Sequence, residues 1–327
     1  MLAEPAGFDR DDLARTLRSG WGIDVVHLRY QPVGFGTHHY RVRASDGTDW
    51  FANVDELAAK TWLGSTGQQV ISGLERALGT AAALRAAGLE FVHAPRPRTT
   101  GGMVAAMAGG YAVSLSGFID GTPHPFGEFP TDQLRRRVLA ALGRMHAATA
   151  TVPPDLPARD RLAVPDRGAL EEALTDLRTA WTGGPYAELA RQLLRASTGA
   201  VRERLGRYDR LVPAVLSTSD RWVVTHGEPH AGNVMRTGDG GIRIIDWDTA
   251  AIGPRERDLW QVEPRTDQDW AAYGGASSLD PAAIELYRRW WELSEICGYT
   301  ATFRAPHADD ANTRVAWREL HGYLAPA

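Results

Sequence analysis

The sequence predicts an α+β fold with two lobes: a small N-terminal lobe with an antiparallel sheet and a helix, and a larger, mainly helical C-terminal lobe. The length of 327 residues exceeds one typical domain and suits two lobes around a cleft. Short strand-like segments separated by glycine turns occupy the first part of the chain, and apolar residues at helical spacing dominate the rest. We therefore expect a first lobe at residues 1–117 and a second at residues 118–327.

The N-terminal lobe is expected to begin with a helix and three strands. The helix is expected at residues 11–17, and the strands at residues 24–30, 38–43 and 49–54, with Asp46-Gly47 as a hairpin turn. The turn at residues 31–37 contains Gly34 and Gly36, and glycine lets backbone N–H groups approach a phosphate closely. Taken alone, this turn predicts a plain hairpin. Ahead of the stretch described below, it predicts a phosphate-covering loop.

Helical periodicity resumes after the third strand. Apolar spacing predicts a helix at residues 72–87, which ends before Gly88. A hairpin is expected from strands at residues 103–108 and 111–116, across Gly109-Gly110. Further helices are expected at residues 131–147, 168–180, 186–208, 281–297 and 313–324.

The composition excludes several classes of protein. A formal charge of −4 gives no overall basic field, so nucleic acid is not expected as a partner. Cys297 is the only cysteine, which excludes an internal disulfide and a thiolate metal cluster. The N-terminal segment lacks the profile of a signal peptide, and the least charged run, residues 101–118, fits a hairpin better than a membrane span. The sequence therefore predicts a cytoplasmic protein without a membrane partner.

The stretch at residues 223–260 carries the candidate chemistry. It places His226, a carboxylate at Glu228 and an amide at Asn233 close together, and an apolar strand at residues 242–245 then ends on Asp246 and Asp248. A carboxylate, an amide five positions on and a carboxylate after the following strand are typical of phosphoryl transfer. In such sites one carboxylate orients or deprotonates an acceptor hydroxyl, while the amide and the last carboxylate hold Mg²⁺ on the nucleotide phosphates.

The motif HGEPHAGN, followed by IIDWD, resembles the aminoglycoside phosphotransferase family and its spectinomycin-phosphotransferase-like branch. The usual family pattern is HGDxHxxN followed by IDxD. The resemblance implies a protein-kinase-like fold with ATP or GTP bound between two lobes and Mg²⁺ as cofactor. Glu228 departs from the pattern, because the family usually has a catalytic Asp there. The charge is retained on a side chain that is one methylene longer.

The resemblance also implies roles for individual residues. Glu228 is expected to act on the acceptor hydroxyl, mainly by positioning it, because a carboxylate is a weak base for an alcohol. Asn233 and Asp246 are the expected Mg²⁺ ligands. Asp248 binds metal or substrate, or caps the following turn. His226 is expected to hold the loop through hydrogen bonds.

Three other residues of the same region are given structural roles. Asp258 resembles the family's structural aspartate, which braces the catalytic loop from a helix. His230 and His226 do not indicate zinc, because the HExxH context is absent. His146 is expected to pack or to cap a helix rather than to bind a ligand.

Lys60 is the only lysine among the 36 basic residues. The family commonly has its phosphate-binding lysine where Asn53 stands, so Lys60 is either a relocated phosphate ligand or a surface lysine; we favour the first, because a compact point charge suits a phosphate. Glu75 either pairs with Lys60 or is a solvated first-turn glutamate. Backbone groups near Ser116 and Phe118, in the expected hinge, are taken to hydrogen-bond the base of the nucleotide.

The leading hypothesis is an ATP- or GTP-dependent kinase that phosphorylates a hydroxyl of a small molecule, with an aminoglycoside or aminocyclitol antibiotic favoured as acceptor. Acidic residues at 256–269 with Trp260 and Trp270 suit a cationic, hydroxylated ligand, although a solvated helix face has the same pattern. A kinase for choline, homoserine or a sugar is the metabolic alternative, and a nucleotide-binding pseudokinase is the alternative without catalysis. A monomer or homodimer is expected.

Overall fold

The computed structural model describes residues 1–5, 7–275 and 278–325. The chain packs into two compact units. The first comprises Met1, Ala3–Asp160 and Thr218–Asp280, and the second comprises Leu2, Arg161–Ser217 and Pro281–Ala327. An antiparallel N-terminal sheet combined with a helical C-terminal part confirms the predicted α+β class. The lobe boundary after residue 117 stays a prediction.

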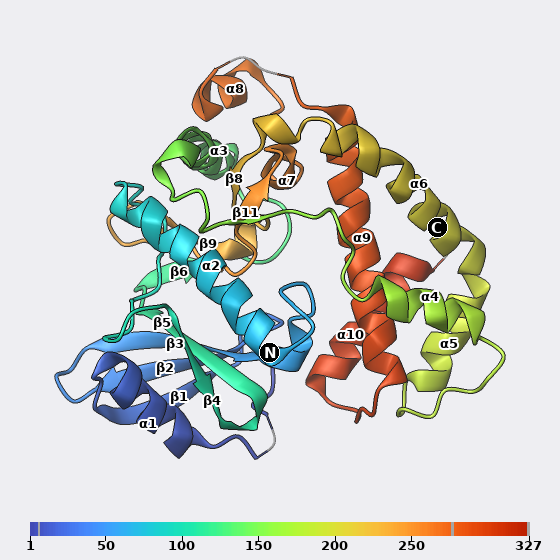
Figure 1. The fold of residues 1–327 in the computed structure, drawn as a ribbon, viewed down its shortest axis with the longest axis horizontal. Coiled ribbons are helices and arrows are strands. Elements are labelled where there is room, and N and C mark those ends of the chain that lie inside the picture. Colours follow the sequence, from blue (N-terminus) through green and yellow to red (C-terminus); the bar gives the residue numbers. More distant parts are fainter. Residues whose placement is uncertain (6, 276–277, 326–327) are drawn as a thin grey trace. The chain divides into compact units, whose positions relative to one another are not determined.

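A five-stranded antiparallel sheet forms the N-terminal part of the first unit (Figure 1). In spatial order its strands are β1 (Val25–Gln31), β2 (His38–Ala44), β3 (Asp49–Glu56), β5 (Tyr111–Gly117) and β4 (Val104–Met107). The three predicted N-terminal strands and the later hairpin are confirmed. Gly47 and Gly109 adopt positive φ, which allows the two tight turns at these positions.

One face of this sheet is apolar and the other is largely polar, because side chains alternate along each strand. The apolar face packs against α1 (Arg10–Trp21), which buries Leu13 and Leu17 (Figure 1). This helix is longer than predicted, since Asp9 caps its start and Gly22, at φ 69°, ends it. The polar residues of the opposite face include His39, Arg41, Asn53 and Asp55.

The helix predicted at residues 72–87 begins earlier, as α2 (Gly67–Ala86). Thr66 starts it with a capping box, in which the Thr66 side chain accepts from the Gln69 N–H and the Gln69 side chain bonds back to the Thr66 backbone. A short 3₁₀ turn, η1 (Leu57–Ala59), leads from β3 to Lys60. The chain after the third strand is therefore turned back toward the sheet.

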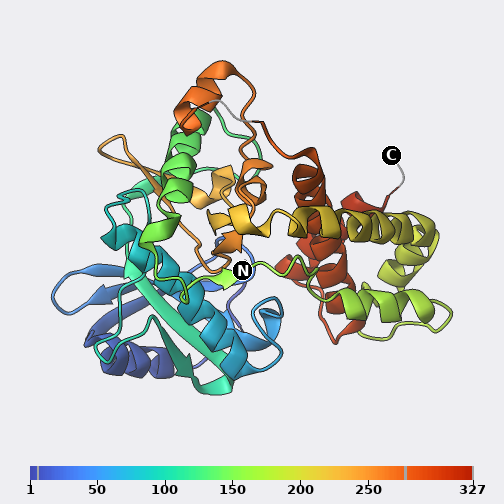
Figure 2. The same cartoon turned by 45° about the horizontal axis from the view of Figure 1, so that its top comes forward.

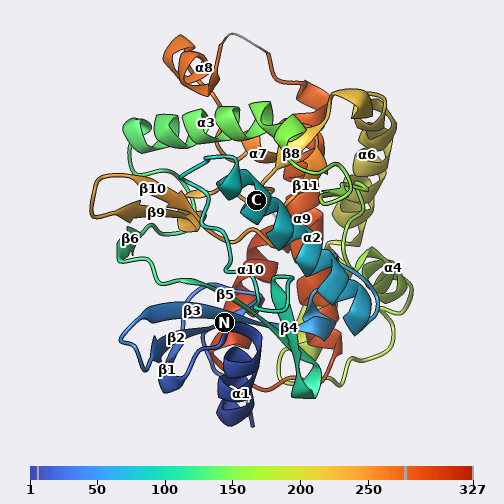
Figure 3. The same cartoon turned by 60° about the vertical axis from the view of Figure 1, so that its left-hand side comes forward.

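The rest of the first unit contains two small sheets and several helices. One sheet has the order β10 (Ile242–Ile244), β9 (Val234–Thr237), β6 (Gly121–Pro123), and the other has the order β7 (Ala158–Arg159), β11 (Ala251–Gly253), β8 (Val223–Thr225). The predicted helix at residues 131–147 is confirmed as α3 (Asp132–Ala147), and it packs against α8 (Asp267–Tyr273) (Figure 3). Between them in sequence, α7 (Glu256–Leu259) follows β11.

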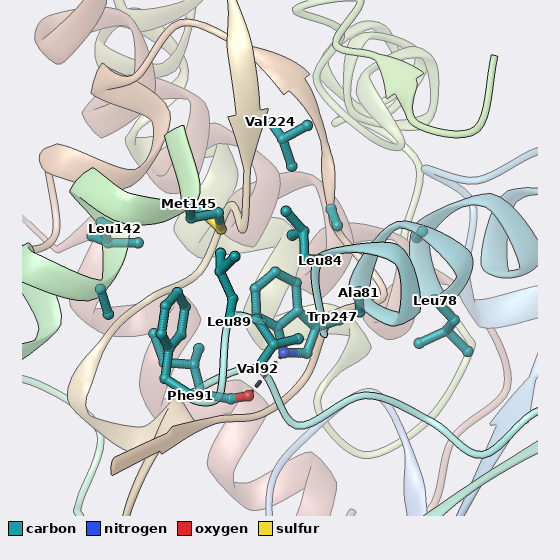
Figure 4. Packing of buried hydrophobic residues seen from close by; sticks show 14 of the residues in the cluster. Leu78, Ala81, Leu84, Leu89, Phe91, Val92, Leu142, Met145, Val224 and Trp247 are labelled. Atoms are coloured by element: carbon teal, nitrogen blue, oxygen red, sulfur yellow. Dashed lines mark hydrogen bonds between the residues drawn. The ribbon is translucent and has the colours of Figure 1, made fainter. Parts of the chain in front are cut away.

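A buried core fixes the end of β10, from which the acidic residues of the site follow. Trp247 belongs to this core together with Leu84, Met145 and Val224 (Figure 4). Its indole N–H donates to the Ile244 carbonyl at 2.8 Å. The Ile244 N–H in turn donates to the Phe91 carbonyl at 2.8 Å. The backbone that precedes Asp246 is therefore held on both sides.

The second unit is helical (Figure 2, yellow-green to gold and red). Its helices are α4 (Arg167–Thr175), α5 (Ala187–Ala196), α6 (Thr198–Leu216), α9 (Pro281–Arg304) and α10 (Ala311–Leu324). The single helix predicted at residues 186–208 is wrong. Ser197 separates α5 from α6, because its N–H bonds to the carbonyls that end α5 and its hydroxyl donates to the Leu324 carbonyl at 2.8 Å.

Two other helices of this unit differ from the predicted bounds. The helix predicted at residues 168–180 ends at Thr175, where the Asp176 N–H closes the last turn on the Ala173 carbonyl. The helix predicted at residues 281–297 continues to Arg304. Among the helices that the structure describes, none combines the length and the apolar character needed to cross a membrane.

Candidate functional site

The loop between β8 and β9 is braced by a buried carboxylate from α7. Asp258 accepts hydrogen bonds from the backbone N–H groups of His226, at 3.1 Å, and Gly227, at 2.6 Å. It also lies 2.9 Å from Nε2 of His146. Burial alone would raise the pKa of Asp258, but the hydrogen bond with His146 and the charges around it lower the pKa instead. Asp258 thus has the bracing position expected for it, and His146 is a packed partner.

His226 connects this loop to the end of β10. Its Nδ1 accepts from the Glu228 N–H at 3.1 Å, and its Nε2 lies 2.9 Å from the Ile245 carbonyl. Because a backbone N–H can only donate, Nδ1 is the acceptor and Nε2 carries the proton. Burial lowers the pKa of His226, which favours this neutral form. The side chain is fully buried, and both ring nitrogens are used to connect the loop to the end of β10.

Asn233 and Glu228 are joined directly. The side-chain N–H of Asn233 donates to the Glu228 carbonyl oxygen at 2.9 Å and lies 3.3 Å from Nε2 of His230. Both contacts use the amide nitrogen, so no described residue hydrogen-bonds the Asn233 Oδ1. The Glu228 side chain is 27% exposed, which leaves its carboxylate accessible at the loop surface.

His230, in the same loop, is a largely buried and neutral histidine. Burial lowers its pKa to about 4, and the nearby His226 acts in the same direction. Its Nε2 lies 3.9 Å from the Glu228 carboxylate, so this approach is not an ion pair near neutral pH. The exposed ring of Phe126 packs edge-on against His230, with 4.7 Å between the ring centroids. His230 thus lies among the Phe126 ring, the Asn233 amide and the Glu228 carboxylate.

Asp246 follows β10 in an unusual backbone conformation. Its φ of 66° is rare for a non-glycine residue and is typical of constrained functional positions. The side chain is exposed, and none of the described residues hydrogen-bonds or ion-pairs with its carboxylate. The pKa of Asp246 is raised well above its ordinary value, first because surrounding protein atoms displace water from the carboxylate and second because Asp248 is negatively charged. The charge of Lys60 acts in the opposite direction. A carboxylate with this much negative charge beside it is well suited to bind a cation.

Asp248 lies in a different environment from Asp246. Its carboxylate forms an ion pair with the Lys60 ammonium at 2.5 Å. Lys60 also bonds to the Asp55 carboxylate and to the Thr37 hydroxyl, both at 2.9 Å, and only 2% of its side chain is exposed. A lysine ammonium has three N–H donors, so all of them are used. Burial lowers the pKa of Lys60, but Asp248 and Asp55 outweigh this and raise it, so the ammonium stays charged.

The predicted phosphate-binding residues are only partly brought together. Gly34 and Gly36 both have positive φ, at 66° and 80°, so the turn requires glycine or a strained residue. Thr37, directly after Gly36, reaches Lys60. Asn53, which occupies the family's usual lysine position, instead hydrogen-bonds Nδ1 of His39 at 2.9 Å. The glycine turn and Lys60 are therefore connected, although the lysine is not on β3.

Glu75 is not a partner of Lys60, and both predicted roles for it are wrong. Its carboxylate accepts the backbone N–H groups of Met103, at 2.7 Å, and Val104, at 2.9 Å. These N–H groups lie at the start of β4, which is an edge strand of the five-stranded sheet. Glu75 thus accepts the backbone N–H groups at the start of β4, and Asp55, not Glu75, is the carboxylate that pairs with Lys60.

The backbone of the expected hinge takes part in the β3–β5 ladder. The Phe118 N–H donates to the Asp49 carbonyl at 3.3 Å, which extends the β3–β5 ladder. Antiparallel pairing alternates, so the pair of Phe51 with Ser116 directs the backbone groups of Ser116 toward β3 as well. Gly117, between them, faces the other way. The Phe118 N–H is therefore engaged in the sheet in this structure, and a backbone group of Gly117 hydrogen-bonds the His93 ring.

The acidic segment at residues 256–269 does not offer open carboxylates at its two ends. Asp269 is fully buried and pairs with Arg135 at 2.9 Å. Glu256 is also buried and accepts from the Asp280 N–H at 3.1 Å. These acids stabilise the fold around α3 and α8, so the expected surface for a cationic ligand is not formed by them.

The available donors fit Mg²⁺ bound together with a nucleotide. The Asp246 carboxylate and the Asn233 Oδ1 are oxygen ligands, which hard cations prefer. Across the described ranges, no group of three or more His, Cys, Asp and Glu side chains is arranged to hold a metal by itself. Mg²⁺ commonly uses one or two carboxylates plus water and substrate phosphates, so this sparse set suits it.

The sequence carries the signature of the Phosphotransferase enzyme family across residues 31–293. The chain belongs to this family. No curated protein sequence matches it. Among solved structures, a spectinomycin phosphotransferase in complex with ADP and spectinomycin is similar with a TM-score of 0.73 and 15% identity, covering 97% of this chain and 94% of the other. These values support the protein-kinase-like fold expected from the motif.

Two other solved structures have the same fold. A microcompartment-associated aminopropanol kinase gives a TM-score of 0.61 at 16% identity, covering 97% of this chain and 94% of the other. A choline kinase from Streptococcus pneumoniae gives 0.55 at 10% identity, covering 97% of this chain and 98% of the other. The fold is therefore shared by phosphotransferases that are named for different small molecules.

Sequence reasoning missed two residues of the site, Thr37 and Asp55. Asp55 lies two positions after Asn53, and strand alternation places both on the same face of the sheet. That periodicity was a usable signal. Thr37 gave none, because an exposed turn threonine and a buried one are identical in sequence.

Proposed function

We propose that the protein transfers the γ-phosphate of ATP or GTP to a hydroxyl group of a small molecule. One observation carries the proposal. The Ile245 N–H donates to the Asn233 carbonyl at 3.0 Å, so the segment that bears Asn233 runs directly beside the segment that leads into Asp246. The Asn233 Oδ1 and the Asp246 carboxylate, which accept no hydrogen bond from the described residues, thus lie on adjacent, hydrogen-bonded segments. Both could bind a metal ion, and the accessible carboxylate of Glu228 belongs to the same loop as Asn233.

In the proposed reaction, the acceptor hydroxyl oxygen bonds to the γ-phosphorus and the bond to the β–γ bridging oxygen breaks. The hydroxyl proton passes to the Glu228 carboxylate, and the products are a phosphate ester and a nucleoside diphosphate. Asn233 and Asp246 would hold Mg²⁺, which neutralises phosphate charge when bound. Asn233 also fixes the backbone of Glu228, so positioning of the base and of the metal are coupled.

The bound nucleotide is proposed to lie under the polar face of the N-terminal sheet. The glycine turn would cover its phosphates, and backbone groups near Ser116 and Phe118 would contact its base. A direct contact between Lys60 and a phosphate requires the ammonium to exchange one of its three partners. The contribution of Asp248 to the metal likewise requires it to leave Lys60.

The acceptor is proposed to be a hydroxylated amine, with an aminoglycoside or aminocyclitol antibiotic favoured. The similar structures are named for spectinomycin, aminopropanol and choline, which all combine a hydroxyl with an amine or ammonium group. A small-metabolite kinase is therefore the second candidate. The two ligand oxygens kept at Asn233 and Asp246 favour catalysis over a binding-only pseudokinase. A cytoplasmic location and a monomer or homodimer stay predictions.

A panel of acceptors tests the proposal. Purified protein with Mg²⁺ and ATP or GTP is incubated with aminocyclitols, aminoglycosides, choline, amino alcohols, homoserine and sugars, and products are read by mass spectrometry. Gain of one phosphoryl group by any member, lost in Glu228→Gln, supports the proposal. Tight binding of nucleotide without transfer to any acceptor favours the pseudokinase.

A further inference from the structure

A buried polar network joins the glycine turn, the third strand and the acidic segment after β10. Lys60 stands at its centre, with Thr37 and Asp55 at 2.9 Å and Asp248 at 2.5 Å. Thr37 also donates its hydroxyl proton to the Asp55 carboxylate at 2.7 Å. We refer to Thr37, Asp55, Lys60 and Asp248 as the Lys60 cluster. It belongs entirely to the first unit.

The Lys60 cluster is nearly closed to solvent. The exposed fractions of the Lys60, Asp55 and Asp248 side chains are 2%, 6% and 14%. Two carboxylates compensate one buried ammonium, and the single hydroxyl of Thr37 serves both as acceptor from Lys60 and as donor to Asp55. Fully satisfied buried polar networks hold their members in one arrangement.

The order of charges reverses the usual kinase pattern. A kinase lobe carries a lysine on its third strand and a glutamate on the following helix. In this chain the third strand supplies the carboxylate, Asp55, and the loop after it supplies the lysine, while the helix glutamate, Glu75, caps a strand end. The network therefore reaches one further element, the glycine turn, through Thr37.

We propose that Thr37 and Asp55 are positioning residues, which act through Lys60 to hold the glycine turn in register with the segment that carries Asp246 and Asp248. The inference rests on the proposed nucleotide-dependent function. Its consequence is specific: the cluster sets the affinity for the nucleotide, and leaves the acceptor KM unchanged. A merely structural network would change stability without changing either KM.

Thr37→Val is the central test, because valine has nearly the same shape and lacks the hydroxyl. Loss of a hydrogen bond to a charged group is expected to raise the nucleotide Kd and KM about tenfold. Thr37→Ser, which keeps the hydroxyl, should restore affinity close to that of the wild type. Thr80→Val is the matched control: Thr80 is fully buried in α2, and its hydroxyl donates to the Arg76 carbonyl at 2.8 Å. This control should leave nucleotide affinity unchanged.

A second variant covers the case in which removal of one charge prevents folding. The double change Lys60→Met with Asp55→Leu removes the two most deeply buried charges together, which proteins tolerate better than loss of one of them, and leaves the Asp248 carboxylate, which is 14% exposed. The double variant should fold by circular dichroism and still bind Mg²⁺·nucleotide about tenfold more weakly or worse.

Calorimetry of Mg²⁺·ATP and Mg²⁺·GTP separates failure of this inference from failure of the proposed function. Wild type that binds neither nucleotide contradicts the proposed function and the inference with it. Wild type that binds, with Thr37→Val and the double variant binding equally well, overturns the inference alone. A lowered Tm in Thr37→Val with unchanged Kd assigns the cluster a structural role and also overturns it.

Discussion

Asn233 donates its side-chain N–H to the Glu228 carbonyl oxygen at 2.9 Å, so a single amide joins the proposed metal site to the proposed base. Asn233→Asp separates these two functions. The carboxylate keeps an oxygen for Mg²⁺ but cannot donate to Glu228, and an acceptor facing an acceptor is unfavourable. We expect kcat to fall by about tenfold or more, as for loss of a hydrogen bond, while Mg²⁺·nucleotide still binds. A kcat equal to that of the wild type would show that the bond does not position Glu228.

Glu228 is expected to act on the acceptor rather than on the nucleotide. Glu228→Gln removes the proton acceptor but keeps the shape, so kcat should fall by about two to four orders of magnitude with nearly unchanged nucleotide affinity. Glu228→Asp restores the residue usual in the family on a shorter side chain. If the loop is adapted to the longer reach, this variant also loses activity. Steady-state kinetics measure both, and full activity of the Gln variant would end the assignment.

Gly227 occupies a backbone position that excludes a side chain. Its φ is 101°, and an added Cβ would lie 2.5 Å from Nη1 of Arg257, which itself donates to the Thr225 hydroxyl. We expect Gly227→Ala to lower the free energy of unfolding by about 1–3 kcal/mol, the cost typical of a strained backbone, and to displace the Glu228 loop. Denaturant unfolding and kcat report the two effects.

The control for Gly227→Ala is Gly199→Ala in α6, where a Cβ meets nothing within 4 Å. Alanine is the better helix former by about 1 kcal/mol, so this variant should be at least as stable as the wild type. Equal unfolding free energies for the two variants would show that the contact with Arg257 is easily relieved.

The stability of the protein is expected to fall in mild acid. Burial lowers the pKa of His39, His93 and His230 to about 4 each. In the unfolded chain they titrate near about 6.5. Between these values the unfolded state binds protons that the folded state does not, so the free energy of unfolding falls as pH drops from about 6.5 toward about 4.

Thermal unfolding across this range measures the effect. The Tm should be highest near about pH 7 and fall steadily by about pH 5. His93→Gln is expected to reduce the slope, because it removes one of the three groups and lies outside the proposed catalytic loop. A Tm that stays constant over the range, or a slope unaffected by the variant, would contradict the assignment of these histidines as buried and neutral.

The fold was largely predictable because its local signals agree. Alternating strands, glycine turns and amphipathic helices each depend on neighbouring residues, so β1, β2, β3 and α3 were expected close to where they are found. The break at Ser197 was not predictable. It depends on the Leu324 carbonyl, which is remote in sequence.

The site was predictable in its residues and less so in its contacts. Glu228, Asn233 and Asp246 follow from a motif whose spacing is local. The partners of Lys60 and Glu75 could not be predicted, because Asp248 and Met103 are brought to these residues only by tertiary packing. The hydrogen bonds of the hinge backbone were not predictable, since the direction of each backbone group depends on the β3–β5 register, which the sequence does not specify.

The most direct test of the proposed chemistry is Mg²⁺-dependent transfer from a prebound nucleotide with a labelled γ-phosphate, measured by rapid quench with a mixed acceptor pool. The proposed site predicts transfer by the wild type with Mg²⁺, no transfer with a chelator, and loss of transfer in Asp246→Asn together with weaker Mg²⁺·nucleotide binding. Transfer by Asp246→Asn at the wild-type rate and affinity would contradict the central role of Asp246.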